Sequence, residues 1–459
     1  MQNYGIISLI PAVIVVILAL ITRKTLEPLV IGSLVGFIIL SKGNFFTAFV
    51  NTALKVMGDP TIGWVILVCG LMGSLIAVLE KSGGINSFAQ LAVKYANTRK
   101  KALFFTWLSG LCLFIDDYLN VLTVGSTMKK VTDKHRIPRA LLAYSVGSTS
   151  APICVLVPFS SWAVFFASLL AAQGLTVNGS GIGAYIHTIP YVFYGWAAVF
   201  IILPLVISDI IPLIGPMKEA NNLALKTGQL FPPDYIEANQ QPVDEGTTEA
   251  TDVNARGNLI NFMLPIIVLI SATIFMGIDL LKGIIIALVF TAIFYGLRKI
   301  MYYEEFMDNC WEGFRSMIFV LGLVIVSFIF KEVNDGLGLT NYVIETVKPL
   351  MNGGWLPAVT FLVTAGVAFA TATFWGLAAI MIPIVIPLAQ AMGVDPFLAS
   401  GAVFSGAAFG SHACFYSDAS ILIAKATGIR PYDHAITQLP YAVMAALMAT
   451  VLYVFFGFV

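Results

Sequence analysis

Long apolar runs separated by short polar joints make up most of this chain. In the first part of the chain they cover residues 6–21, 29–40, 64–79 and 185–207. A helix needs about 20 apolar residues to cross a bilayer, so these runs predict membrane-spanning helices. The same pattern returns after residue 258, which predicts an all-α polytopic membrane protein.

One apolar run, residues 102–124, is interrupted by two adjacent carboxylates, Asp116 and Asp117, with Asn120 one turn further on. No lysine or arginine lies within this run. A carboxylate at bilayer depth costs roughly 2.5–3.5 kcal/mol and is kept where it faces a cavity, an ion or a proton path. These residues are therefore the first candidates for ion binding. The alternative is a surface turn between two helices.

The run from residue 141 to 171 is apolar but broken in the middle by Pro152 and again by Pro158. Proline removes a backbone donor, and small hydroxyl residues can bond the carbonyls that are freed. Interrupted spans of this kind point to a transporter binding site, although an ordinary proline-kinked helix is the alternative. The candidate binding residues here are Ser148, Thr149, Ser150, Ser161 and Trp162.

Composition supports a membrane protein, because 58% of the residues are hydrophobic and only 11% are charged. The net charge is zero, which gives no argument for a nucleic-acid partner. The five cysteines show no CxxC spacing, so neither a disulfide framework nor a zinc site is indicated. No catalytic signature such as GxSxG occurs, so we expect neither an enzyme nor a bound cofactor.

The chain repeats itself around one polar stretch. We predict a first transmembrane repeat at 1–207, a cytoplasmic linker at 208–257 and a second repeat at 258–459. The offset between corresponding positions stays near 250 to 260, from 250 between Gly63 and Gly313 to 260 between Cys154 and Cys414.

Basic residues indicate how the repeats are oriented. If residues 102–128 form a re-entrant hairpin, each repeat crosses the membrane an odd number of times and the second repeat is inverted. Most lysines and arginines then fall on one side, which the positive-inside rule makes cytoplasmic, with both termini external. We therefore predict two inverted-topology repeats, each with a re-entrant hairpin and a broken helix.

The second repeat supplies its own candidates at the corresponding places. Asp418 is a third candidate ion-binding acid, but it could instead cap a helix over residues 419–427. His412 could handle protons or could be a satisfied core histidine, and His434 is expected to be structural or interfacial. Trp375, like Trp162, falls at a helix break and could shape a substrate pocket. The candidate residues of this repeat are Thr371, Thr373, Ser411, His412, Ser417 and Asp418.

Four stretches carry a resemblance to a known family: residues 114–120 (FIDDYLN), 148–154 (STSAPIC), 417–422 (SDASIL) and 433–441 (DHAITQLPY). In these motifs the chain resembles the NhaC family of sodium/proton antiporters. The resemblance implies an ion-transporter-superfamily fold with inverted repeats in a bacterial or archaeal inner membrane. The family includes sodium/proton antiporters and members that exchange or co-transport organic acids or amino acids.

Two departures from the family pattern bear on the transported substrate. Gly147 stands where members often have an aspartate. Residues 410–416 (GSHACFY) also contain neither the second acid nor the proline that members often have in this segment. Fewer acids mean fewer exchangeable charges, and Phe415 and Tyr416 could line a pocket for an organic solute.

Our leading hypothesis is sodium/proton exchange, with Asp116, Asp117 and Asp418 as the sodium candidates. The alternative is sodium- or proton-coupled transport of a small organic solute such as an amino acid or a carboxylate. A channel is disfavoured, because no ring of one charge suggests a pore. The expected partners are the lipid bilayer and, by analogy with other transporters, a second copy of the chain.

Overall fold

The computed structural model describes residues 4–22, 26–84, 94–204, 212–231, 258–277, 279–347, 349, 351–371, 374–415 and 417–459. These residues form helices, turns and loops, and no β-strand occurs among them. The helices long and apolar enough to cross a membrane are Leu26–Met57, Ile62–Lys81, Leu280–Leu297, Gly353–Ala370, Phe374–Met392 and Pro431–Phe458. The predicted all-α polytopic membrane fold is confirmed.

The helices up to residue 231 are α1 (Ile10–Thr22), α2 (Leu26–Ser41), α3 (Phe45–Met57), α4 (Pro60–Lys81), α6 (Arg99–Cys112), α7 (Asp117–Lys134), α8 (Arg139–Ser148), α9 (Ala151–Cys154), α10 (Ser161–Ala172), α11 (Gly181–Thr188), α12 (Phe193–Phe200) and α13 (Gly215–Thr227). The later helices are α15 (Leu259–Phe275), α16 (Leu280–Leu297), α17 (Tyr303–Ser316), α18 (Ile318–Leu337), α19 (Leu339–Val347), α20 (Leu356–Thr371), α21 (Phe374–Met392), α22 (Pro396–Ala413), α23 (Asp418–Thr427) and α24 (Pro431–Phe458). Short 3-10 turns lie at Gly5–Leu9, Lys42–Asn44, Ile189–Tyr191 and Gly353–Trp355.

Two of these helix assignments concern the residue ranges predicted for the linker and for the span at 185–207. The predicted linker, 208–257, is described only at 212–231, where α13 lies. The prediction of one continuous span over 185–207 was wrong, because α11 and α12 are separated by the turn Ile189–Tyr191. Pro190 within this turn has no N–H to donate to the preceding helical turn.

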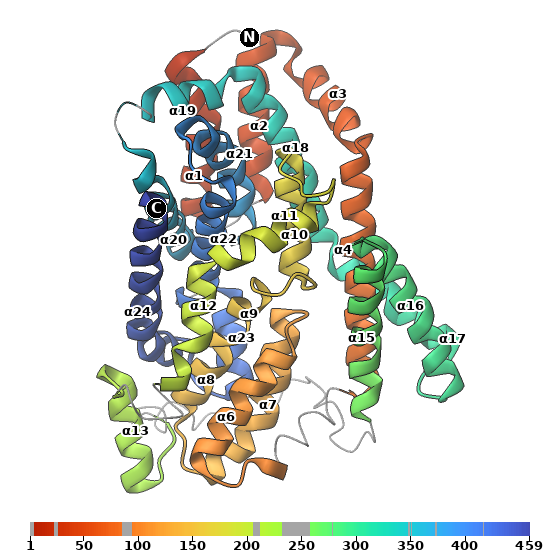
Figure 1. The fold of residues 1–459 in the computed structure, drawn as a ribbon, viewed down its shortest axis with the longest axis vertical. Coiled ribbons are helices and arrows are strands. Elements are labelled where there is room, and N and C mark those ends of the chain that lie inside the picture. The colour runs from red at the N-terminus through yellow and green to blue at the C-terminus, as the bar shows by residue number, and fades with distance from the viewer. Residues whose placement is uncertain are drawn as a thin grey trace.

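The acidic stretch lies at the tip of a helical hairpin. α6 and α7 pack against each other and are joined by the short loop 113–116, and Figure 1 shows them side by side. At 1.5 Å per residue, α6 is about 21 Å long and α7 about 27 Å, less than the ~30 Å of a bilayer core. This is the helix pair predicted within residues 102–128, while its entry and exit on one membrane face stays a prediction.

Both predicted helix breaks are present, and each contains an equivalent hydrogen bond from a serine hydroxyl to a cysteine carbonyl. In the first, the Oγ of Ser160 donates to the carbonyl oxygen of Cys154 at 2.5 Å. In the second, the Oγ of Ser420 donates to the carbonyl oxygen of Cys414 at 2.7 Å. Each serine lies six residues after its acceptor, so equivalent side chains satisfy equivalent carbonyls left open by the interrupted helices.

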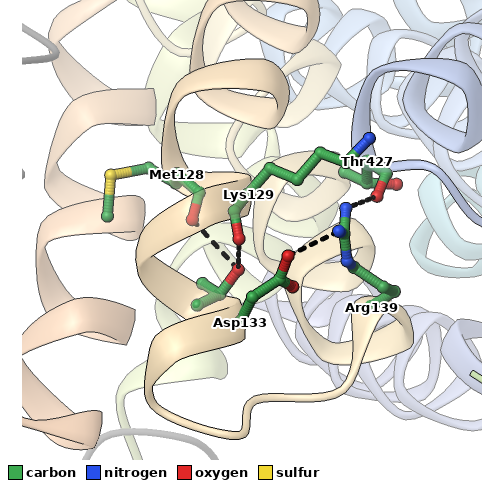
Figure 2. Close-up of polar contacts among 6 residues, drawn as sticks. Met128, Lys129, Asp133, Arg139 and Thr427 are labelled. Carbon is green, nitrogen blue, oxygen red and sulfur yellow. Dashed lines mark hydrogen bonds and ion pairs between the residues drawn. The ribbon is translucent and has the colours of Figure 1, made fainter. Parts of the chain in front are cut away.

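A charged cluster ties three helices together outside the six apolar spans. Figure 2 shows the guanidinium of Arg139, at the start of α8, donating to Asp133 on α7 and to the carbonyl of Thr427, where α23 ends. The Arg139–Asp133 ion pair measures 2.6 Å, and the Arg139 side chain is 7% exposed. A cation at the C-terminus of a helix also interacts favourably with the helix dipole.

Candidate functional site

Asp116 holds the hairpin loop in place through both oxygens of its carboxylate. One oxygen accepts hydrogen bonds from the backbone N–H groups of Tyr118 and Leu119, both at 3.1 Å. It therefore caps α7, where a carboxylate satisfies open donors and complements the helix dipole. The other oxygen accepts a hydrogen bond from the Ser161 hydroxyl at 3.1 Å. The predicted functional acid thus also joins the hairpin tip to the start of α10.

Two further contacts dock the same loop onto the first helix break. The backbone N–H of Ser161 donates to the carbonyl of Ile115 at 2.9 Å. The thiol of Cys154 donates to the carbonyl of Phe114 at 3.2 Å. The tip of the hairpin is therefore attached to both ends of the loop that separates α9 from α10.

Asn120 gathers three backbone carbonyls at the centre of this junction. Its side-chain amide nitrogen donates to Gly110 at 2.7 Å, Leu113 at 3.2 Å and Thr149 at 2.7 Å. These carbonyls lie where α6 and α8 end, and helix ends leave such groups without an intrahelical partner. A side chain at Gly110 would not fit, since an added Cβ would lie 2.0 Å from the hydroxyl of Thr149. Asn120 and Thr149 are therefore in direct contact, while their role in ion or substrate binding stays a prediction.

Asp117 lines a cavity of about 530 Å³ and is itself only 2% exposed. The lining residues come mainly from α4, α17, α7 and α10, together with Trp375 of α21. The charged lining residues are Glu80, Lys81, Asp116, Asp117 and Glu312. The structure thus places both predicted acids of the hairpin at one cavity.

An aromatic stack brings the two predicted repeats together beside this cavity. The ring of Trp162, at the start of α10, stacks on Phe374 at 5.0 Å and lies 4.8 Å from the ring of Trp375, both at the start of α21. Trp375 lines the cavity, whereas Trp162 is fully buried behind it. Of the two tryptophans predicted to shape a pocket, Trp375 forms the surface and Trp162 supports it.

A second group of buried polar residues surrounds His412. One ring nitrogen lies 2.8 Å from the hydroxyl of Tyr194, and the other lies 3.5 Å from that of Ser148. The side-chain amide of Gln438 donates to the His412 carbonyl at 2.6 Å. His434 on α24 is fully buried, which fits the structural one of the two roles expected for it. It is the fourth residue of α24, and this position in the sequence could not show that neighbouring helices cover it.

The remaining predicted residues that the structure describes lie at or beside the two helix breaks and at the end of α20. Ser150 bonds locally to the carbonyl of Gly147 at 3.0 Å, and Ser411 is buried. Thr371 ends α20 and Asp418 begins α23, while Thr373 lies outside the described residues.

The alternative that Asp418 caps the helix after the second break was wrong. Ser417 is the cap, because its hydroxyl accepts a hydrogen bond from the backbone N–H of Ser420 at 3.0 Å. The same hydroxyl donates to the Ser411 carbonyl at 2.9 Å, so Ser417 spans the break.

The cavity includes two acids that sequence reasoning did not select, Glu80 and Glu312. Glu80 is the first charged residue after the apolar run 64–79. Glu312 directly precedes Gly313, near the start of a later apolar run. Both therefore look like parts of polar joints between spans. Asn309, one turn before Glu312, also lines the cavity and is 6% exposed.

A family model described as the Na⁺/H⁺ antiporter family matches residues 178–458, which is more than half of the chain. The chain belongs to the Na⁺/H⁺ antiporter family. Membership confirms the resemblance seen in the sequence motifs, and this antiporter-family protein is a multi-pass membrane transporter rather than an enzyme.

Other proteins similar to this family member cover nearly its whole length. An uncharacterized protein of Haemophilus influenzae is 28% identical over 98% of this chain and 91% of its own. MtrF of Neisseria gonorrhoeae, described with a class of antimetabolite efflux pumps, has a TM-score of 0.57 at 14% identity, over 90% of this chain and 85% of MtrF. The YdaH transporter of Alcanivorax borkumensis, described as having an unusual topology, has a TM-score of 0.56 at 15% identity, over 91% and 89% of the two chains. At these identities the solved structures show a shared fold.

Proposed function

We propose that this transporter exchanges sodium ions for protons, with Asp117 as the principal ion-carrying carboxylate and Asp116 beside it. The observation that carries the proposal is the position of Asp117, which is 2% exposed at the wall of a cavity about 530 Å³ in volume. Asp418, at the start of α23, is the further candidate in the second repeat.

Burial explains why such a carboxylate would exchange ions. Removing it from water disfavours the charged form, so the group is neutralised either by a proton or by a bound cation. The two events exclude each other on one carboxylate, and this competition couples sodium movement to proton movement. Sodium is a hard cation, and carboxylate, amide and hydroxyl oxygens are the donors that suit it. Asp116, Asn120 and Ser161 supply such oxygens at the hairpin tip.

The membrane setting completes the proposal. The bundle lies in a bacterial or archaeal membrane with the basic loops in the cytoplasm and both termini outside, because lysine and arginine are retained on the cytoplasmic side. Pairing with a second copy follows only by analogy with other transporters.

Proteoliposomes loaded with a pH-sensitive dye test the exchange. A pulse of external sodium should drive proton efflux in the wild type, and Asp117→Asn should abolish it. Asp116→Asn should also reduce the flux while the protein stays folded, because asparagine caps a helix about as well as aspartate.

Asp395→Asn is the matched control, since Asp395 caps α22 through the N–H of Phe397 and does not line the cavity. This variant should keep the wild-type flux. Sodium-driven proton movement that persists unchanged in Asp117→Asn would refute the assignment of the ion to that carboxylate.

A further inference from the structure

The cavity is much larger than a sodium ion requires. A water molecule occupies about 30 Å³ of liquid volume, and the cavity holds about 530 Å³. Pockets that bind small organic molecules measure roughly 300–1,000 Å³. The volume therefore accommodates an organic solute in addition to the ion site at the hairpin tip.

Several acidic residues line this cavity. Asp116 and Asp117 come from the hairpin, while Glu80 belongs to α4 and Glu312 to α17. Lys81 is the one basic side chain among the described lining residues. Glu80 is close enough to Asp116 and Glu312 for their charges to act on it. An excess of carboxylates in a cleft attracts cations and repels anions.

Helix geometry shows that the Glu80 wall is a built surface. Cys69, Met72, Gly73, Ile76, Ala77 and Glu80 all line the cavity, and their spacing of three and four residues places them on one face of α4. Gly73 of α4 and Gly313 of α17 lie in backbone contact, since a Cβ on Gly73 would lie 2.3 Å from the Gly313 carbonyl oxygen. This close approach sets Glu80 and Glu312 on neighbouring helices that face the same space.

Apolar groups make up most of the remaining surface. Met72 and Ile76 belong to the α4 wall, Leu122 to α7 and Trp375 to α21. An aromatic ring beside carboxylates suits a positively charged nitrogen that carries carbon substituents, because the ring face attracts cations and the carbon atoms leave water. A carboxylate-bearing solute without a positive charge would meet repulsion from these carboxylates.

We propose that this cavity binds a small organic cation, with its ammonium group between the Glu80–Glu312 wall and the hairpin acids and its carbon atoms against Trp375. The inference rests on the proposed function, because the same hairpin acids would return protons in exchange for the organic cation. Glu80 and Glu312 would then determine specificity for the organic cation, while sodium would depend on Asp117.

Uptake of radiolabelled choline and tetraethylammonium into sodium-free, acid-loaded proteoliposomes tests the inference. Neither probe has a neutral form that could cross the bilayer alone. Saturable uptake driven by the pH gradient is expected in the wild type. The double variant Glu80→Gln, Glu312→Gln should raise the KM for these cations about tenfold, the ratio that follows from losing ~1.4 kcal/mol of binding. An unchanged circular-dichroism spectrum and thermal midpoint in detergent show that the variant is folded.

Glu304→Gln is the matched control, because Glu304 lies on the same helix, α17, but does not line the cavity. This variant should transport both kinds of cation normally. Sodium flux without organic-cation uptake would overturn this inference and leave the proposed function intact. Organic-cation uptake without sodium flux would support the inference and overturn sodium exchange. Uptake that is unchanged in the double variant would overturn the assignment to Glu80 and Glu312.

Discussion

Replacing Asn120 with leucine removes the donor group that three buried carbonyls share, while the number and branching of the side-chain heavy atoms stay the same. The amide of Asn120 reaches Gly110 and Thr149 at 2.7 Å and Leu113 at 3.2 Å, and the residue is fully buried. Leucine cannot donate, so the carbonyls at the ends of α6 and α8 lose their partner. Each buried polar group left without a partner costs about 1–3 kcal/mol.

Counting the two shorter hydrogen bonds, we expect Asn120→Leu to lower the free energy of unfolding by roughly 2–6 kcal/mol. In domains of 150–250 residues each kcal/mol shifts the unfolding midpoint by roughly 2–4 °C, so a fall of several degrees is expected. Circular dichroism at 222 nm during a thermal ramp in detergent measures the midpoint. Hydrogen exchange should also show that the loop 113–116 loses protection, because its attachment to the helix break is weakened.

Thr106→Val is the control for this experiment. Thr106 is fully buried in α6 and its hydroxyl bonds only to the carbonyl of Ala102 on the same helix, at 2.8 Å. Its loss should cost no more than about 1 kcal/mol. If Asn120→Leu unfolds at the same temperature as Thr106→Val, the reasoning that Asn120 holds the hairpin to the break is wrong.

Three further predictions concern helix packing and the cluster in Figure 2. Gly73→Ala should separate α4 from α17, because the alanine Cβ would lie 2.3 Å from the Gly313 carbonyl oxygen. Such overpacking costs about 1–3 kcal/mol, and an unchanged thermal midpoint would contradict this prediction. Arg139→Met should destabilise the protein by roughly 1–3 kcal/mol, because Asp133 and the Thr427 carbonyl both lose their donor; breaking a fully buried ion pair costs about 3–5 kcal/mol. Denaturant unfolding measures the change in stability, and a neutral result would show that the cluster is dispensable. Burial raises the pKa of Asp133, although the charge of Arg139 opposes this. Above the ordinary aspartate value of about 3.9, the native state therefore binds more protons than the unfolded state. Stability then falls as the pH rises from that value through the raised pKa. The difference in midpoint between wild type and Asp133→Asn should therefore change as the pH rises above the ordinary aspartate value, and a constant difference would rule out this linkage.

The hairpin tip could be predicted from the sequence because its evidence is local. Asp116 and Asp117 stand out as adjacent charges inside an apolar run, and Pro152 marks the helix break beside them. Each of these signals needs only its own neighbours in the chain. The capping role of Asp116 is also local, since it precedes the first turn of α7.

Residues whose roles depend on distant partners could not be predicted. Glu80 and Glu312 lie far apart in the sequence, and only the contact between α4 and α17 places them at one cavity. His434 follows a charged residue near a helix start, a position that the sequence cannot distinguish from the membrane surface. Its burial is set by packing of α24 against α8, α22 and α23.

The most direct test of the central claim is the movement of sodium itself against protons. Acid-loaded proteoliposomes containing the wild-type protein should accumulate ²²Na⁺ above its external concentration while their interior becomes alkaline, and collapsing the pH gradient should stop this accumulation. Asp117→Asn should show neither change, while Asp395→Asn should behave as the wild type does. Sodium uptake without alkalinisation, or accumulation above the external concentration that continues after the pH gradient is collapsed, would contradict sodium/proton exchange.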